Sequence, residues 1–159
     1  MKVRVGFGFD VHQLREGRPC ILGGIEITHH KGPYGHSDAD VLIHAICDAL
    51  LGAANLKDIG YHFPDTSAEF KSIDSKVLLK KVVDLVRSKG YELGNIDTTL
   101  VLEQPKIKPH IDEMQKVLSV VMGIDMEDIS IKATTNEKLG FVGREEGVTA
   151  YAVALISKK

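Results

Sequence analysis

Two side chains of the metal-binding type lie two residues apart near the start of the chain. Asp10 and His12 follow the run Val3–Phe7, whose β-branched and aromatic residues next to glycine predict a strand. Residues two apart on a strand project from the same face, so the carboxylate and the imidazole would point toward one place. Both groups are ordinary zinc ligands, but catalytic zinc takes three protein ligands. Without a third ligand, the simpler interpretation is a strand end that meets solvent.

A candidate third ligand, His44, lies on a predicted helix. Asp40, His44 and Asp48 are four residues apart and share one helical face, where an acid one turn away on each side would orient the imidazole. For His44 alone, a solvated helix face is the alternative. Together with Asp10 and His12, it predicts an open three-ligand site with one coordination position left for a substrate.

The helix that carries His44 is predicted over residues 41–54. Ser37 followed by Asp40 is typical of a capping box at the start of a helix. Apolar residues then recur at helical spacing and predict a buried stripe, which consists of Leu42, Ala45, Ile46, Ala49, Leu50 and Ala53.

Two further segments favour an anionic ligand. Residues 133–144 follow a predicted strand over 129–132 and contain hydroxyls, an amide, a carboxylate and two cations, which suit an oxygen-rich anion together with a hard metal such as Mg²⁺. Residues 105–109 follow a predicted strand over 95–104, and two prolines would hold them extended, with two lysines and free backbone groups. A polar turn and a stiff connector are the alternatives.

The remaining elements would position these segments in one sheet with flanking helices. The pattern predicts a hairpin over 20–28, polar loops over 29–35 and 58–67, helices over 74–89 and 110–122 that end at glycines, and a last strand over 147–157.

Composition narrows the class of protein. A chain of 159 residues with 43% hydrophobic and 26% charged residues predicts a single globular domain over 1–159. The 20 basic and 22 acidic residues nearly balance, which argues against nucleic acid as a partner. The chain shows neither a signal segment nor an apolar run of about 18 residues, so no membrane association is expected. Cys20 and Cys47 do not form a disulfide framework, which favours a cytoplasmic location.

Seven motifs in this order carry a resemblance to a known family; they span residues 8–12, 36–40, 48–54, 58–60, 63–65, 104–106 and 132–135. On these motifs the chain resembles the 2-C-methyl-D-erythritol 2,4-cyclodiphosphate synthases of the non-mevalonate isoprenoid pathway, over essentially its whole length. The resemblance implies an α+β fold with a mixed β-sheet, helices packed on one face, and sheets that face the axis of a homotrimer. Active sites would lie between subunits.

The resemblance also implies a reaction and its cofactors. The substrate would be 4-diphosphocytidyl-2-C-methyl-D-erythritol 2-phosphate, which is cyclised with loss of CMP. Zn²⁺ or another divalent transition metal would occupy one site, and Mg²⁺ or Mn²⁺ would accompany the diphosphate.

Residue roles follow by matching positions to the family. Asp10, His12 and His44 match the zinc ligands, and Glu137 matches the residue of the second ion. The substrate-binding residues also include Asp10, His12, His36, Thr135 and Glu137. His36 and Thr135 match positions that stabilise the transition state. The erythritol and phosphate environment corresponds to Ser37, Asp58, Ile59, Gly60, Phe63, Pro64, Asp65, Thr66 and Ser67. The nucleotide pocket corresponds to Leu102, Glu103, Gln104, Pro105, Lys106, Ile107, Lys108, Ala133 and Thr134.

Two residues match positions near the mouth of an axial cavity, and two places in the sequence depart from the family pattern. Phe141 and Arg144 match the mouth of that cavity and are counted with the substrate-binding residues. Asn136, also counted there, stands where the family often has a third threonine. Ile107 and Lys108 stand where relatives have two apolar residues, which matters little if backbone groups hold the nucleotide.

Charge then indicates the mechanism. The 2-phosphate is already anionic near pH 7, because its second pKa is roughly 6, so no protein nucleophile is needed. The difficulty is to bring one anion against another, and metal ions and lysines would offset that repulsion. The alternatives are a metal-dependent phosphohydrolase and a non-catalytic trimer that binds diphosphates. The three zinc ligands and the Thr-Thr-x-Glu run argue against the second.

Overall fold

The fold is built on a five-stranded sheet with the strand order β4-β1-β7-β5-β6. The computed structural model describes residues 1–158. The strands of the sheet are β1 (Lys2–Glu16), β4 (Lys31–Tyr34), β5 (Glu92–Val101), β6 (Ile129–Thr134) and β7 (Gly147–Lys158). Neighbouring strands are antiparallel except β5 and β6, which are parallel, so the predicted mixed sheet is confirmed.

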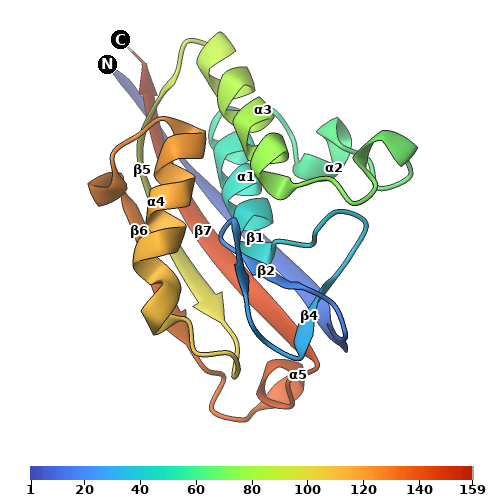
Figure 1. The fold of residues 1–159 in the computed structure, drawn as a ribbon. Helices are drawn as coiled ribbons and strands as arrows, with labels where there is room; N and C mark the ends of the chain where they lie inside the picture. The colour runs from blue at the N-terminus through green and yellow to red at the C-terminus, as the bar shows by residue number, and fades with distance from the viewer. Residues whose placement is uncertain (159) are drawn as a thin grey trace.

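Three helices cover one face of this sheet (Figure 1). They are α1 (Val41–Ala53), α3 (Ser75–Ser88) and α4 (Ile111–Met122), and the helices predicted from apolar spacing are confirmed within one or two residues at each end. Helix α1 lies directly against β1 and β7, and α3 packs against α1. The core between these layers is formed by side chains such as Leu42, Leu50 and Ile96, all fully buried.

Helix α1 approaches β1 closely because two strand residues have no side chain. A Cβ atom added to Gly6 would lie 1.9 Å from the carbonyl oxygen of Ala49, and one added to Gly8 would lie 1.9 Å from that of Ala45. Neither position therefore leaves room for any other residue type. This contact brings the helix face that carries His44 alongside the strand that carries Asp10.

The opposite face of β1 and β7 is apolar and accessible to solvent in the single chain. Alternation along a strand places one set of side chains on each face. The accessible set consists of Val3, Val5, Phe7, Phe9 and Val11 on β1 with Tyr151 and Val153 on β7, each between 40% and 63% exposed. Phe9 and Tyr151 pack against each other, with ring centroids 5.2 Å apart.

The loops contain more structure than the sequence pattern predicts. The predicted hairpin is confirmed as β2 (Cys20–Leu22) and β3 (Ile25–Ile27). The predicted polar loop over 29–35 contains β4, which pairs with the part of β1 beyond His12. The predicted loop over 58–67 contains the short helix α2 (Ile59–His62), and the segment over 133–144 contains α5 (Gly140–Gly143). Single 3₁₀ turns span Ala68–Phe70, Lys108–His110 and Met126–Asp128.

The predicted capping box at α1 is wrong. Asp40, not Ser37, is the N-cap residue, and its Oδ1 accepts a hydrogen bond from the backbone N–H of Ile43 at 3.1 Å. The Ser37 hydroxyl instead accepts from the N–H of Ala39 at 3.1 Å. Asp40 also accepts from the N–H groups of Gly23 and Gly24, so its buried carboxylate joins the β2–β3 turn to the start of α1.

Two features bear on the predictions from composition. Within residues 1–158, no helix has both the length and the apolar character that crossing a bilayer requires. Cys20 and Cys47 are free thiols, and both are buried.

Candidate metal centre and flanking pockets

Asp10, His12 and His44 bring three potential ligand atoms together. Asp10 Oδ2 lies 3.0 Å from His12 Nε2 and 3.1 Å from His44 Nδ1, and the two ring nitrogens are 3.2 Å apart. Ligand atoms about 2.0 Å from a tetrahedral zinc ion would lie about 3.3 Å from one another. Among the described residues, this is the one group of three such side chains with converging ligand atoms. The predicted convergence of strand and helix is confirmed.

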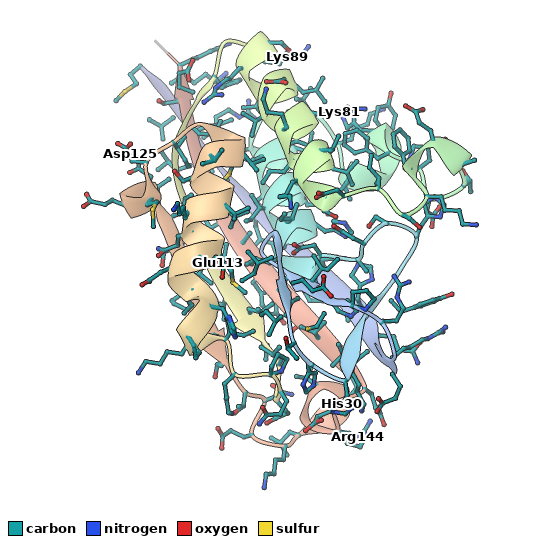
Figure 2. The ribbon with its side chains drawn as sticks, in the orientation of Figure 1. His30, Lys81, Lys89, Glu113, Asp125 and Arg144 are labelled. Atoms are coloured by element: carbon teal, nitrogen blue, oxygen red, sulfur yellow. The ribbon has the colours of Figure 1, made fainter. Side chains whose placement is uncertain are left out.

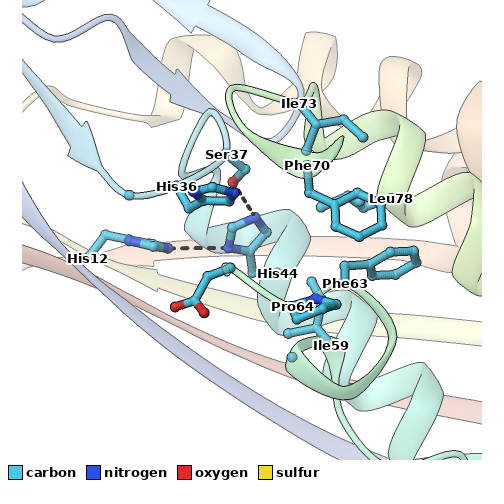
Figure 3. A pocket seen from close by; sticks show the side chains of 13 residues that line it. His12, His36, Ser37, His44, Ile59, Phe63, Pro64, Phe70, Ile73 and Leu78 are labelled. Carbon is cyan, nitrogen blue, oxygen red and sulfur yellow. Dashed lines mark hydrogen bonds between the residues drawn. The ribbon is translucent and has the colours of Figure 1, made fainter. Parts of the chain in front are cut away.

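Hydrogen bonds on the far side of each imidazole fix which nitrogen faces the centre. His12 Nδ1 lies 3.0 Å from the carbonyl oxygen of Tyr34, which can only accept, so Nδ1 carries a proton and Nε2 is the nitrogen that faces the centre. His44 Nε2 lies 2.9 Å from the hydroxyl oxygen of Ser75 and 3.2 Å from that of Ser37 (Figure 3), which leaves Nδ1 for the centre. The three residues therefore fit a divalent metal ion.

The acids predicted to orient His44 do not contact its ring. The carboxylate of Asp40 accepts hydrogen bonds from the backbone N–H groups of Gly23, Gly24 and Ile43. Asp48 Oδ1 accepts a hydrogen bond from the N–H of Ile59 at 2.8 Å. That part of the prediction is wrong, because helical spacing gives a shared face but not the direction in which each side chain turns. Asp48 instead ties α1 to the beginning of α2.

The charges at the centre favour a cation. Burial alone would raise the pKa of Asp10, but hydrogen bonds and charge from His12 and His44 outweigh it and lower that pKa to about 2. Burial would likewise lower the pKa of His12, yet the hydrogen bond to Asp10 and the negative charge of Asp10 raise it. Asp10 is thus an anion throughout the physiological range, and a metal ion would take the place of the imidazole protons.

A hollow of about 400 Å³ opens beside the two histidines (Figure 3). Of the predicted substrate residues, it is lined by His36, Ser37, Ile59, Gly60, Phe63, Pro64 and Asp65, together with His12 and His44. Gly35, Phe70, Ile73 and Leu78 also line it and were not predicted. Asp58, Thr66 and Ser67 do not line it. Within this hollow, acidic, imidazole and hydroxyl groups face an apolar wall of Phe63, Phe70 and Leu78.

Two hydrogen bonds hold the loop that forms one wall of this hollow. Asp58 caps α2 by accepting from the N–H of Tyr61 at 2.9 Å. His36 Nε2 lies 2.9 Å from the carbonyl oxygen of Ser67, so this ring donates to the end of the loop. Asp58 and Ser67, which were predicted to contact substrate, therefore shape the loop whose other residues line the hollow.

A second, smaller hollow of about 140 Å³ lies at the ends of β5 and β6. It is lined by Leu102, Pro105, Lys106, Ile107, Lys108, Ala133, Thr134 and Thr135. All but Thr135 were predicted for the nucleotide pocket, and Thr135 was predicted to stabilise the transition state. Glu103, Gln104, Asn136 and Glu137 do not line it. The two hollows have no lining residue in common.

The turn that carries Thr135 and Glu137 is clamped from the neighbouring loop. Glu103 Oε1 accepts hydrogen bonds from the N–H groups of Asn136 at 3.1 Å and Lys138 at 3.0 Å. The Thr135 hydroxyl donates to Glu137 Oε1 at 3.1 Å. Glu137 and Lys138 have φ values of 52° and 61°, a backbone conformation that costs energy for residues with a side chain. The Glu103 carboxylate offsets that cost.

Phe141 and Arg144 lie in and just after α5. Figure 2 shows Arg144 at the same end of the molecule as His30, where Lys31 Nζ donates to the carbonyl oxygen of Glu145 at 3.2 Å. The guanidinium of Arg144 bonds to both carboxylate oxygens of Glu146, at 3.0 and 3.1 Å. Their place at the mouth of an axial cavity stays a prediction.

Sequence reasoning missed two partners of the histidine rings. Ser75 was taken only as part of a helix start, and Tyr34 was placed in a loop. A serine at the first turn of a helix is so common that its spacing from His44 carries no signal. The carbonyl of Tyr34 is a backbone group, so only the pairing of β4 with β1 could have identified it.

Comparison with known proteins adds an independent finding. The profile of the YgbB family matches residues 3–157. Over 158 residues the chain is 68% identical to the 2-C-methyl-D-erythritol 2,4-cyclodiphosphate synthases of Bacteroides fragilis and Bacteroides thetaiotaomicron, with 99% of each chain covered.

Solved structures agree with this finding. The chain is similar to the bifunctional IspDF from Campylobacter jejuni, with a TM-score of 0.96 and 43% identity over 99% of this chain and 43% of that chain. It is similar to a CDP complex of IspF from Plasmodium falciparum, with a TM-score of 0.87 and 33% identity over 99% of this chain and 97% of that chain. A CDP-bound 2C-methyl-D-erythritol-2,4-cyclodiphosphate synthase gives a TM-score of 0.90 and 38% identity over 97% and 100% of the two chains.

Proposed function

Since the chain belongs to the YgbB family and is an enzyme that converts 4-diphosphocytidyl-2-C-methyl-D-erythritol 2-phosphate to 2-C-methyl-D-erythritol 2,4-cyclodiphosphate and CMP, we propose that Asp10, His12 and His44 form the centre of that reaction. The observation that supports this most is the convergence of three ligand atoms at the edge of the larger hollow.

Asp10, His12 and His44 would hold Zn²⁺ or another divalent transition metal. The set offers one carboxylate and two imidazoles, which leaves the fourth tetrahedral position open, as in catalytic zinc sites. An ion held there would supply Lewis-acid polarisation of a phosphate oxygen and neutralise charge that opposes the attack. Glu137 would serve a second ion, Mg²⁺ or Mn²⁺, that accompanies the diphosphate, and Thr135 beside it would stabilise the transition state.

The smaller hollow would receive the cytidine end of the substrate. Two related proteins have been solved with CDP, which supports a cytidine diphosphate ligand. Lys106 and Lys108 supply positive charge at the rim, and Leu102 with Ile107 supply a buried apolar base. The backbone groups of the loop would bind the nucleotide edge, so Lys108 in place of an apolar residue leaves the pocket intact.

The larger hollow would hold the erythritol arm. Ser37, Ile59, Gly60 and Asp65, which line it, would offer hydroxyl, backbone and carboxylate groups, and His36, also in its lining, would stabilise the transition state. Folding the arm back would bring the 2-phosphate against the β-phosphorus. The chain's contribution is therefore orientation and charge, because the substrate brings its own nucleophile.

The complete site would be shared between copies of the chain in a homotrimer. One substrate must reach both hollows, yet these have no lining residue in common. The exposed apolar face of β1 and β7 is suited to association with identical chains, because contiguous apolar surface of this kind marks an interface. The Asp10–His12–His44 centre of one subunit would then work with Thr135 and Glu137 of its neighbour.

His44→Ala tests the assignment of the centre. We expect this variant to fold, to lose a stoichiometric divalent ion and to form no cyclic product from the nucleotide substrate, as followed by elemental analysis and ³¹P NMR. His30→Ala is the matched control, because His30 also pairs with a carboxylate, that of Glu16 at 3.0 Å, but belongs to no group of three converging ligand atoms among the described residues. Full zinc retention and turnover in His44→Ala would rule out the assignment.

A further inference from the structure

Behind His44, on the side away from the centre, a buried hydroxyl connects the ring to a carboxylate. Ser75 is the first residue of α3 and is fully buried, and its Oγ lies 2.9 Å from His44 Nε2. The same hydroxyl makes a short hydrogen bond to Asp38 Oδ1. Asp38 has no role in the proposed reaction, and Ser75 has none beyond its contact with His44.

In the series His44–Ser75–Asp38, the donor and the acceptor of each hydrogen bond follow from the protons that each group carries. An ionised carboxylate only accepts, so the single proton of the Ser75 hydroxyl goes to Asp38. The Ser75 oxygen can then only accept from His44, which places the His44 proton on Nε2. Nδ1 is consequently the nitrogen that faces Asp10 and His12: it donates to Asp10 in the metal-free protein, and a metal ion bound there would displace that proton.

Backbone N–H groups hold the Asp38 carboxylate in place independently of its hydrogen bond to the Ser75 hydroxyl. Its Oδ2 accepts from the backbone N–H of Ser75 at 2.9 Å, and its Oδ1 accepts from the N–H of Asp40 at 3.2 Å. The backbone N–H of Asp38 itself donates to the carbonyl of Ile73 at 3.1 Å. The carboxylate is thus fixed between the starts of α1 and α3, and it cannot turn away when the ring is perturbed.

We propose that Ser75 and Asp38 are positioning residues that hold His44 in its Nε2–H tautomer and thereby set the affinity of the centre for a divalent metal ion. The inference rests on the proposed metal centre and deepens it. Hydrogen-bonded partners behind a ligating histidine orient the ring and increase its basicity, and their removal typically weakens metal binding about 10- to 100-fold.

Ser37 is the nearest substitute for Ser75. Its hydroxyl lies farther from His44 Nε2, at 3.2 Å, and already accepts from the N–H of Ala39. Among the described residues, its hydroxyl makes no hydrogen bond to a carboxylate, so it would replace Ser75 only in part. Ser75→Ala should therefore leave the ring in the site but less firmly oriented.

A purely structural role would make a different prediction. If Ser75 and Asp38 only join α1 to α3, their loss would act through stability of the helix start. Asp74 is the matched control, because it is the N-cap residue of the same helix and accepts from the N–H of Lys76 at 2.8 Å, without any contact to His44.

The experiment measures Zn²⁺ affinity of the metal-free full-length protein by competition with a chromophoric chelator, without substrate. We expect Ser75→Ala to weaken binding about 10- to 100-fold and Asp38→Asn to weaken it in the same direction, while Asp74→Asn stays within about 3-fold of the wild type. Thermal unfolding of each metal-free variant shows that it is folded. If Ser75→Ala does not fold, Asp38→Asn against Asp74→Asn decides the question.

A second measurement reports the tautomer directly. Long-range ¹H–¹⁵N spectra of the metal-free protein should show a proton on His44 Nε2 throughout the wild-type population, and in Ser75→Ala part of the population should lack it. Wild-type affinity in Ser75→Ala, or an equal loss in Asp74→Asn, would overturn the proposal. A wild-type protein that binds no Zn²⁺ would instead overturn the metal centre itself, so the two failures are distinguishable.

Discussion

Asp10 shows how much at this site depends on a single residue. Its Oδ2 lies within 3.1 Å of nitrogens from both histidines, so one carboxylate connects the strand and the helix through charge as well as distance. Its pKa of about 2 means that acid does not protonate it in any ordinary buffer. Period-two alternation alone was enough to predict the pairing with His12, because that alternation is a property of the strand backbone.

At the same scale, the cysteines offer a prediction that involves pH. Burial, with the nearby charges of Asp40 and Glu26, raises the pKa of Cys20 from an ordinary 9.0 to about 11. At pH 9 the folded protein should therefore carry about fiftyfold less thiolate at Cys20 than the unfolded chain. Iodoacetamide labelling followed by mass spectrometry should find Cys20 unmodified until urea is added. Rapid labelling of the folded protein would contradict the burial that the structure shows.

The same shift has a consequence for stability. The folded-state pKa lies above the unfolded value, so the stabilising effect of the protonated thiol is complete below pH 9. As the pH rises from about 9 to about 11, the unfolded chain loses this proton first and the free energy of unfolding falls. Cys20→Ser should reduce that part of the alkaline dependence.

At the scale of elements, the approach of α1 to β1 decides whether the ligands meet. Gly8→Ala would place a Cβ 1.9 Å from the carbonyl oxygen of Ala45, so the helix must move. We expect a loss of about 1–3 kcal/mol in the free energy of unfolding, measured with urea, and weaker metal binding as His44 moves with the helix.

Gly52 in α1 provides the control for this prediction. It is exposed, and the nearest atom that an added Cβ would meet, the carbonyl oxygen of Phe7, is 4.0 Å away. Gly52→Ala should raise the free energy of unfolding by up to about 1 kcal/mol through helix propensity. Equal stability for Gly8→Ala and wild type would show that the contact between α1 and β1 is looser than described.

The elements also show where prediction from sequence succeeds and where it stops. Helices α1, α3 and α4 were found because their apolar residues repeat at helical spacing and their ends are marked. Strand β4 was missed because Gly32 and Pro33 oppose strand formation locally, and pairing with β1 outweighs that tendency. Ser75 was missed as a partner of His44 because 31 residues separate them and no local pattern relates them.

The family resemblance predicted more of the residues that line the two hollows than the chemistry of individual side chains did. Eight of the predicted substrate residues, including His12, line the larger hollow, although the sequence pattern of the 58–67 segment indicated only a loop. The role of Glu103 could not be foreseen either way, because its contact with the 136–138 turn depends on the parallel pairing of β5 and β6.

At the scale of the whole molecule, the proposed sharing of sites can be tested with two inactive proteins. Asp10→Ala removes a metal ligand, and Thr135→Ala removes a group of the other hollow. If the variants are unfolded, mixed equally and refolded as a cyclic trimer, about a quarter of the interfaces should carry both intact halves. Activity should therefore return to about a quarter of the wild-type value.

Each variant refolded alone is the control, and it should stay inactive. Native mass spectrometry must show that the subunits have mixed. Mixed trimers without any recovered activity would mean that each site lies within a single chain.

In the proposed reaction the substrate's own phosphate attacks the β-phosphorus, and isotope labelling tests this directly. Well-oriented intramolecular groups reach effective concentrations of about 10⁵ M or more, against roughly 55 M for water, provided that the bound geometry is right. When the reaction is run in ¹⁸O-labelled water, mass spectrometry should therefore find no label in either CMP or the cyclic diphosphate. Label in CMP, or in an open-chain diphosphate, would show that water attacks and that the site acts as a phosphohydrolase.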